Sequence, residues 1–222
     1  MSSCYLVTLS RPRDGTRLVY DRGAALILAL LLTLLITVVG SALIMAVATE
    51  HLITANDRDA EELVHAADAG LERAFLELSR VAEWTDVLTG ATIARVRDNT
   101  LSPRFPDGRV VSLAELTHEA QASTDREPWG ANNPRWRLFV YGRLAHVVGL
   151  TLEGPPLAYV VVWVGDDHAD GDGNPHRDDN DTITLRCQAY GVRHGRRTIE
   201  ATVARADPYP ASLSVLSWRL AE

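Results

Sequence analysis

An uninterrupted apolar segment near the N-terminus constrains this chain more than any other feature. From Gly23 to Thr49 there are 27 residues without a charged side chain. As an α-helix, residues 24–49 rise about 1.5 Å each and reach about 39 Å, which exceeds the roughly 30 Å hydrocarbon core of a bilayer. Fourteen of these residues are Leu, Ile or Val, and each favours insertion by roughly 0.3–0.6 kcal/mol at mid-membrane. The sequence therefore predicts a transmembrane helix over residues 24–49.

Charged residues flank this segment unequally and predict its orientation. Acidic residues dominate the sequence that follows, starting with Glu50. The arginines that precede it are Arg11, Arg13, Arg17 and Arg22. Because positive flanks stay in the cytoplasm, we expect a single membrane pass with the N-terminus in the cytoplasm and the C-terminal domain on the other side.

Three interpretations of the N-terminus remain open. A secretory signal cleaved after Ala48 would use the small-x-small triplet Ala46-Val47-Ala48, but its apolar stretch normally has only 7–15 residues. An uncleaved membrane anchor is the second interpretation. The third is a polar leader over residues 1–23 that ends at Gly23, directly before the apolar run. This layout resembles type IV prepilins, which are cut after the glycine.

Helical periodicity continues beyond the membrane segment, over residues 50–82. No proline interrupts residues 24–102, and opposite charges recur four residues apart at Arg58/Glu62 and Arg73/Glu77. Small and apolar residues fall on one helical face; they are Ala60, Val64, Ala67, Leu71, Phe75 and Leu78. We expect one helix from about Ala24 to about Val81, whose later half packs on its own C-terminal domain.

Three motifs of this N-terminal region resemble PilX-type minor pilins of type IV pili. The resemblance covers residues 22 to about 75. The motifs are Arg22-Gly23 before the apolar run, Ala55-Asn56-Asp57-Arg58-Asp59, and Ala66-Ala67-Asp68-Ala69-Gly70-Leu71. The resemblance implies a minor pilin that primes, caps or decorates a pilus at the cell surface. It also implies cleavage between Gly23 and Ala24 by prepilin peptidase and N-methylation of Ala24. The implied partners are other minor and major pilins and the inner-membrane assembly platform.

One position departs from the major pilins. Leu28 is the fifth residue after the expected cut, where major pilins carry a glutamate that pairs with a neighbour's amino terminus. An uncompensated charge in lipid is costly. A subunit that lacks this glutamate therefore suits a tip or priming position better than a bulk position in the filament. Minor pseudopilins of type II secretion share this departure, and they are the alternative within the same class.

Composition excludes several other classes. All 22 basic residues are arginine, so lysine-dependent Schiff-base or Walker-type phosphate chemistry is not available. A formal charge of −7 gives no basic footprint for nucleic acid. The two cysteines, Cys4 and Cys187, are too few for a cysteine-rich metal site, and we expect Cys187 to be a buried core residue. The sequence predicts no enzyme and no catalytic residue.

The remainder of the chain predicts an α+β, type IV pilin-like fold. Residues 83–135 are mixed, with a helix from a capping box at Ser112 to about Ala122. Residues 136–222 have strand periodicity, with Gly195 expected to take a positive φ in a hairpin turn. About four antiparallel strands are expected on the long helix; they cover residues 136–141, 157–164, 182–189 and 198–203.

An acidic loop over residues 166–181 lies between two of these strands. Carboxylates at this density repel one another unless a cation or solvent screens them, and oxygen ligands with glycines are typical of calcium loops. The loop fails the EF-hand pattern, because Asp179 stands where the twelfth-position glutamate belongs. Alternatives are a solvated hairpin tip, a transition-metal site through His168 and His176, and a secreted or anchored calcium-binding module. The predicted calcium ligands are Asp166, Asp167, Asp170, Asp172, Asn174, Asp178, Asp179 and Asp181.

Overall fold

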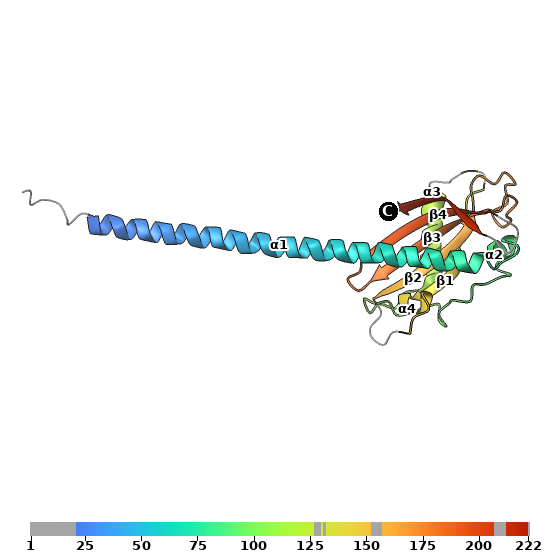
Figure 1. Cartoon of the computed structure of the whole chain (residues 1–222), viewed down its shortest axis with the longest axis horizontal. Coiled ribbons are helices and arrows are strands. Elements are labelled where there is room, and N and C mark those ends of the chain that lie inside the picture. The colour runs from blue at the N-terminus through green and yellow to red at the C-terminus, as the bar shows by residue number, and fades with distance from the viewer. Residues whose placement is uncertain (1–20, 127–129, 131, 152–156, 207–211, 222) are drawn as a thin grey trace, which may run out of the picture. The chain divides into compact units, whose positions relative to one another are not determined.

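A computed structural model describes residues 21–126, 130, 132–151, 157–206 and 212–221 of this chain. The chain divides into two compact units, residues 1–54 and residues 55–222. The expected leader, residues 1–23, lies mostly outside the described residues, as does Cys4. Helix α1 (Asp21–Leu78) supplies the described part of the first unit and the start of the second (Figure 1).

From residue 55 onward, helix α1 buries one face, and this confirms the predicted amphipathic half. The buried positions on it are Leu63, Ala66, Ala67, Gly70, Leu71, Ala74, Glu77 and Leu78. Both predicted charge pairs form, with N–O distances of 2.9 Å for Arg58–Glu62 and for Arg73–Glu77. The helix ends at Leu78, three residues before the expected end, and its last turn tightens so that the Val81 N–H donates to the Leu78 carbonyl (3.0 Å). Such tightening is common where a helix terminates.

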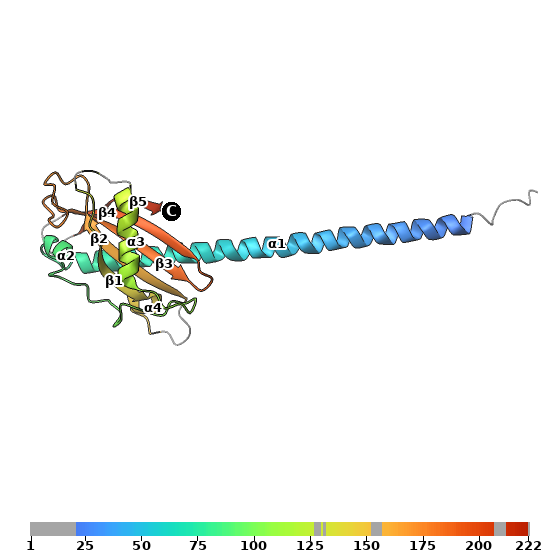
Figure 2. The same cartoon turned by 180° about the vertical axis from the view of Figure 1, so that it is seen from behind.

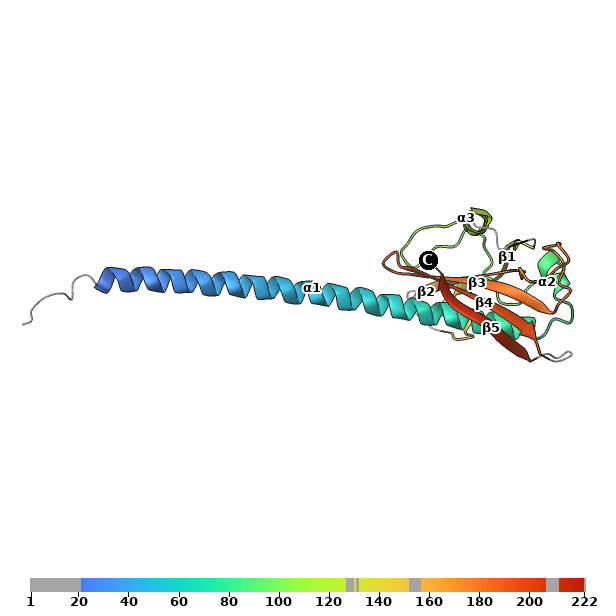
Figure 3. The ribbon, with the colours of Figure 1, turned by 90° about the horizontal axis from the view of Figure 1, so that it is seen from above.

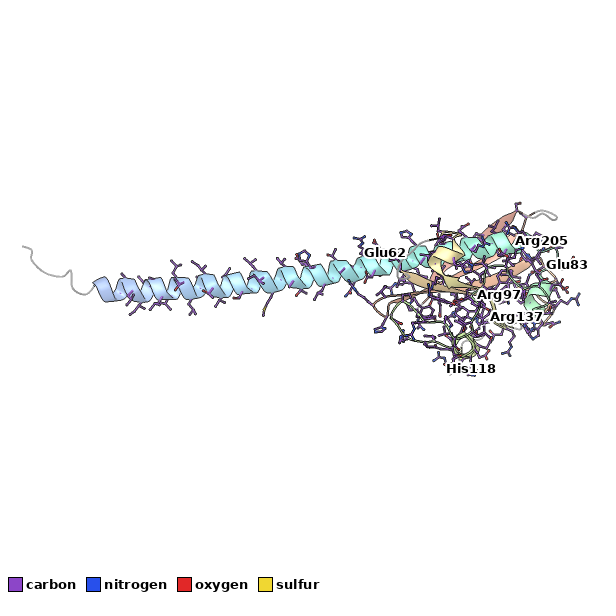
Figure 4. All side chains as sticks on the ribbon, turned by 90° about the horizontal axis from the view of Figure 1, so that it is seen from below. Glu62, Glu83, Arg97, His118, Arg137 and Arg205 are labelled. Atoms are coloured by element: carbon purple, nitrogen blue, oxygen red, sulfur yellow. The ribbon has the colours of Figure 1, made fainter. Side chains whose placement is uncertain are left out.

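Arg205 caps this end of α1 from the sheet. Its guanidinium donates to the carbonyls of Val81 (3.4 Å) and Ala82 (2.5 Å), which lie just past the helix end and have no N–H group of a further helical turn to donate to them. The same group stacks 4.6 Å above the centre of the Trp84 ring. Figure 4 labels Arg205 beside the C-terminal end of the helix. A cation at this end is favourable because the helix dipole is negative there.

Five antiparallel strands form one sheet in sequence order. The expected number was about four, and the strand that sequence analysis missed is the last. The strands are β1 (Arg137–Arg143), β2 (Ala158–Asp166), β3 (Thr182–Gly191), β4 (Arg196–Arg205) and β5 (Leu213–Ala221). Strand β2 is buried along its whole length, as its two-sided apolar sequence predicts. The α+β class, with a long N-terminal helix and an antiparallel sheet, is therefore confirmed.

Two apolar cores cover the two faces of this sheet. The latter half of α1 packs on one face, where Leu71, Val160 and Cys187 meet. Helix α3 (Leu113–Arg126) lies on the other face, as Figures 2 and 3 show. Phe105 contributes to the second core by stacking on Tyr159, with ring centres 4.8 Å apart. Part of the mixed region therefore has a structural role, since it supplies the layer opposite α1.

The remaining helices are short. Helix α2 (Thr85–Thr89) follows α1, and helix α4 (Leu144–Val147) follows β1. Helix α3 begins as its capping box predicts, since the Ser112 hydroxyl accepts the Glu115 N–H (3.3 Å). It continues to Arg126, four residues past its expected end.

The hairpin turn between β3 and β4 corrects one expectation. The residue with positive φ is His194 (φ 61°), and Gly195 has no positive φ. Gly195 lies close to α1 instead, since a Cβ at that position would be 2.9 Å from Leu63 Cδ1 and the Leu63 side chain would have to shift. The glycine therefore permits close packing of the helix on the turn.

Candidate functional site

The first candidate is the apolar part of α1, residues 23–54. One helix of the described chain is long and apolar enough to cross a membrane, with a mean hydropathy of 2.8 in its most apolar window, and that window is unburied. Leu28 and Leu35, for example, are 66% and 59% exposed. An apolar surface of this extent requires lipid or other apolar helices around it. These properties fit membrane anchoring.

Within residues 24–49, the predicted membrane span, the polar side chains bond to the backbone of their own helix. Each hydroxyl donates to a carbonyl three or four residues earlier, so no polar hydrogen is left for an external acceptor. The distances are 2.9 Å for Thr33, 2.7 Å for Thr37, 2.8 Å for Ser41 and 2.9 Å for Thr49. The segment therefore enters an apolar environment without an unpaired donor.

The expected processing residues lie at the start of this helix. Gly23 and Ala24 are both exposed and helical. A Cβ added to Gly23 would meet nothing within 4 Å, and glycine costs about 1 kcal/mol relative to alanine inside a helix. Nothing in the described structure thus requires a glycine at this position.

The second candidate is the acidic loop between β2 and β3. Three of the eight predicted ligands converge, since carboxylate oxygens of Asp166, Asp170 and Asp172 lie within 4.8 Å of one another. Asp166 and Asp170 are buried, at 0% and 5% exposure, and Asp172 is exposed. Among the described residues, this is the one group of acidic, His or Cys side chains placed to hold a metal ion together.

Other predicted ligands hold the loop itself in shape. Asp167 accepts the Ala169 N–H (2.9 Å) and the Asn180 side-chain amide (2.8 Å). The remaining four accept hydrogen bonds or form ion pairs within or beside the loop. Their partners are His176 N–H for Asn174 (3.3 Å), Thr182 N–H for Asp178 (3.1 Å), Arg177 for Asp179 (2.7 Å) and Arg205 for Asp181 (3.6 Å).

Burial makes this cluster electrostatically unfavourable when fully ionised. Burial, reinforced by the charges of Asp170, Asp167 and Asp178, raises the pKa of Asp166 to about 8, although the Asp167 N–H donates to it. Burial also raises the pKa of Asp178 to about 6, with the Asp181 charge acting in the same direction. A proton or a cation is needed to relieve the repulsion between these carboxylates.

Asn132 is the residue of this site that sequence reasoning missed. It lies 34 residues before Asp166 and is fully buried, and its side-chain amide donates to the Asp166 carboxylate. Its side-chain oxygen is also buried and has no hydrogen-bond partner among the described residues. Asn132 is one of two adjacent asparagines in a segment that also contains proline and glycine, and this pattern gives no signal of the contact in the sequence.

Cys187 is placed as predicted. It is a free, fully buried cysteine on the α1 side of the sheet, and burial raises the pKa of its thiol. A neutral buried thiol acts as a small apolar side chain rather than a nucleophile.

Comparison with known proteins bears on the N-terminal region. Residues 22–72 match the family model "PilX N-terminal". This match confirms the resemblance of the N-terminal region to PilX-type pilins. The matched residues span the apolar and amphipathic parts of α1 and end before the sheet. No curated protein and no solved structure gives a significant match.

Proposed function

We propose that this protein is a minor pilin that primes or caps a type IV pilus and is incorporated into it from the inner membrane. The observation that supports this best is the PilX N-terminal match over the same residues that form α1. Within that match, an apolar surface with no cover in the described chain is followed by a face buried against the sheet. A filament subunit needs both surfaces, one for assembly and one to carry its folded domain.

Prepilin peptidase cuts the chain between Gly23 and Ala24 in this proposal, and Ala24 becomes the methylated N-terminus. Gly23 is exposed and surrounded by open space, so recognition by a processing enzyme explains a glycine that the fold does not require. Until the cut is made, the arginines of the leader hold the cleavage site on the cytoplasmic side of the membrane.

Position Leu28 supports a terminal place in the filament. A subunit below another in a pilus must compensate the charged amino terminus of its neighbour, and an unpaired charge in an apolar bundle is costly. Leu28 cannot supply a carboxylate. A subunit at the tip, with no neighbour above it, does not need one.

Processing is tested by intact-mass measurement of the protein from cells with and without prepilin peptidase. We expect a chain beginning at methylated Ala24 in the first case and the uncut chain in the second. Gly23→Val should block the cut, whereas the matched control Gly40→Val, at the other glycine of the apolar helix, should be cut normally. Equal mass in both strains would refute the proposal.

Assembly is tested by deleting the gene and counting surface pili. A priming or capping subunit predicts a large loss of pili, restored by the wild-type chain and not by Gly23→Val. Normal piliation with a defect in protein secretion would instead identify a type II secretion pseudopilin.

A further inference from the structure

The acidic cluster at the end of β2 lacks a counter-charge. None of Asp166, Asp170 and Asp172 forms an ion pair with an arginine or histidine in the part of the chain that the structure describes. The nearby cations act elsewhere, since Arg177 pairs with Asp179 and Arg205 with Asp181. Carboxylates this close together repel strongly, the more so when two of them are buried.

Asn132 is an independent observation that points to a ligand at this cluster. Its amide contacts the Asp166 carboxylate, so the end of the Asn132 side chain lies at the cluster. Its oxygen is fully buried and receives no hydrogen bond from any residue that the structure describes, whereas buried polar atoms in folded proteins almost always have a partner. A cation among the carboxylates would give this oxygen a partner and also neutralise the acids.

We propose that Asp166, Asp170, Asp172 and the side-chain oxygen of Asn132 form a calcium site. All four donors are hard oxygen atoms, which Ca²⁺ prefers, and backbone carbonyls or water complete its six to eight ligands. No histidine belongs to this donor group, which disfavours Zn²⁺ and other transition metals. Mg²⁺ demands a strict octahedron, whereas Ca²⁺ tolerates the irregular geometry that donors from two separate loops provide.

The loop is already arranged to hold an ion. One oxygen of Asp170 accepts the Asp172 N–H (3.1 Å), and the other accepts the Asp179 N–H (2.9 Å), so Asp170 closes the loop on itself. Gly173 takes a left-handed conformation (φ 70°) directly after Asp172. Binding therefore needs little ordering of the chain, which favours affinity.

A bound ion would join two distant segments of the domain. The Asn132 segment and the β2–β3 loop are far apart in sequence but adjacent here, with the Cβ position of Gly130 lying 3.7 Å from the His168 carbonyl oxygen. An ion held by both segments binds the folded state and not the unfolded one, so calcium should stabilise the domain. This inference concerns residues 130–182 and does not depend on processing or on pilus assembly.

The test uses the full chain in detergent micelles after removal of metal with EGTA. Thermal unfolding is followed while CaCl2, MgCl2 or ZnCl2 is titrated, and calcium binding is measured directly by calorimetry at 20 °C. We expect a saturable rise in Tm of roughly 5–10 °C when calcium reaches a hundredfold its dissociation constant. Extracellular calcium modules set the expected affinity, a dissociation constant of about 0.1–1 mM or tighter.

Four variants separate a specific site from general charge screening. Asp166→Asn should abolish calcium binding, and Asp172→Asn and Asn132→Ala should each weaken it at least about tenfold. Asp179→Asn is the matched control: it removes one negative charge from the same loop but no proposed ligand, and its affinity should stay within twofold of wild type. Calorimetry on folded protein keeps the comparison valid where a variant has a lower Tm.

Three outcomes would overturn the proposal. The first is no binding and no Tm shift in the wild-type protein at 5 mM CaCl2. The second is an equal calcium response in Asp166→Asn and Asp179→Asn, which would mean general screening of an acidic loop. The third is stronger stabilisation by Mg²⁺ or Zn²⁺ than by Ca²⁺.

Discussion

Residues 23–54 and residues 55–78 belong to one helix but have opposite relations to the rest of the chain. In the first stretch almost every side chain is exposed, although nearly all are apolar. In the second, alternating buried and exposed positions follow the helical repeat. A helix that is apolar on every side needs partners outside its own chain, whereas an amphipathic helix is stabilised by its own domain.

Matched leucine truncations on α1 should have very different effects on stability. Leu71 is 1% exposed and packs in the core, whereas Leu34 is 61% exposed. Leu71→Ala should lower the free energy of unfolding by about 2–5 kcal/mol, because it removes buried methyl groups and leaves a cavity. Leu34→Ala should leave it unchanged. Chemical denaturation in detergent, followed by tryptophan fluorescence, measures both, and equal effects would contradict the contrast.

The two interior glycines of α1 provide a second matched pair. A Cβ at Gly70 would lie 2.9 Å from Cys187 Sγ and still closer to Val160, whereas Gly40 has open space around it. Gly70→Ala should destabilise the domain by about 1–2 kcal/mol, since overpacking outweighs the gain of about 1 kcal/mol in helix propensity. Gly40→Ala should not destabilise it. If Gly70→Ala is more stable than wild type in the same denaturation assay, then Val160 and Cys187 shift at little cost to make room for the added methyl group.

Acid sensitivity should be confined to the folded unit that begins at residue 55, because residues 24–49 carry no charge. Burial works to raise the pKa of Asp107, but hydrogen bonds from Arg109 and His194 outweigh it and lower the pKa to about 2. A carboxyl whose pKa falls on folding stabilises the protein above its unfolded pKa of about 4, and this contribution is lost as the pH falls towards 2. We expect Asp107 to contribute about 0.5–1 kcal/mol to the free energy of unfolding, because solvent around the exposed Arg109 and His194 weakens the interaction.

The measurement compares wild type with Asp107→Asn by denaturation at several pH values. The difference in unfolding free energy between the two proteins should be largest near neutral pH and close to zero near pH 2. A difference that persists undiminished at pH 2 would mean that Asp107 acts through packing rather than through its charge.

Periodicity in the sequence was sufficient for the main elements of the fold. The long helix and strands β1 to β4 follow directly from hydrophobic spacing. Strand β5 could have been found by the same means, since Leu213, Val215, Trp218 and Leu220 are spaced two or three residues apart. A bulge opposite Thr202 and Val203 breaks its register, and such a break disrupts a strict two-residue alternation.

Side-chain placement was harder to predict because it depends on contacts between distant segments. The sequence predicts a positive φ at Gly195, but the positive φ belongs to His194. Gly195 instead leaves room for the Leu63 side chain of α1. The acidic loop stood out by composition, but composition does not say which carboxylates converge. Asn132 comes from another loop, and only the folded chain places it beside Asp166.

The hydroxyl groups of Thr33, Thr37, Ser41 and Thr49 all donate to carbonyls of their own helix. Transfer of this segment from a lipid bilayer to a sheath of neighbouring helices would thus leave every one of those bonds as it was. The exchange carries little energetic penalty in either direction, and discrimination among neighbours must arise from the fit of van der Waals surfaces. A subunit built this way can leave one hydrophobic medium for another without rearranging its backbone.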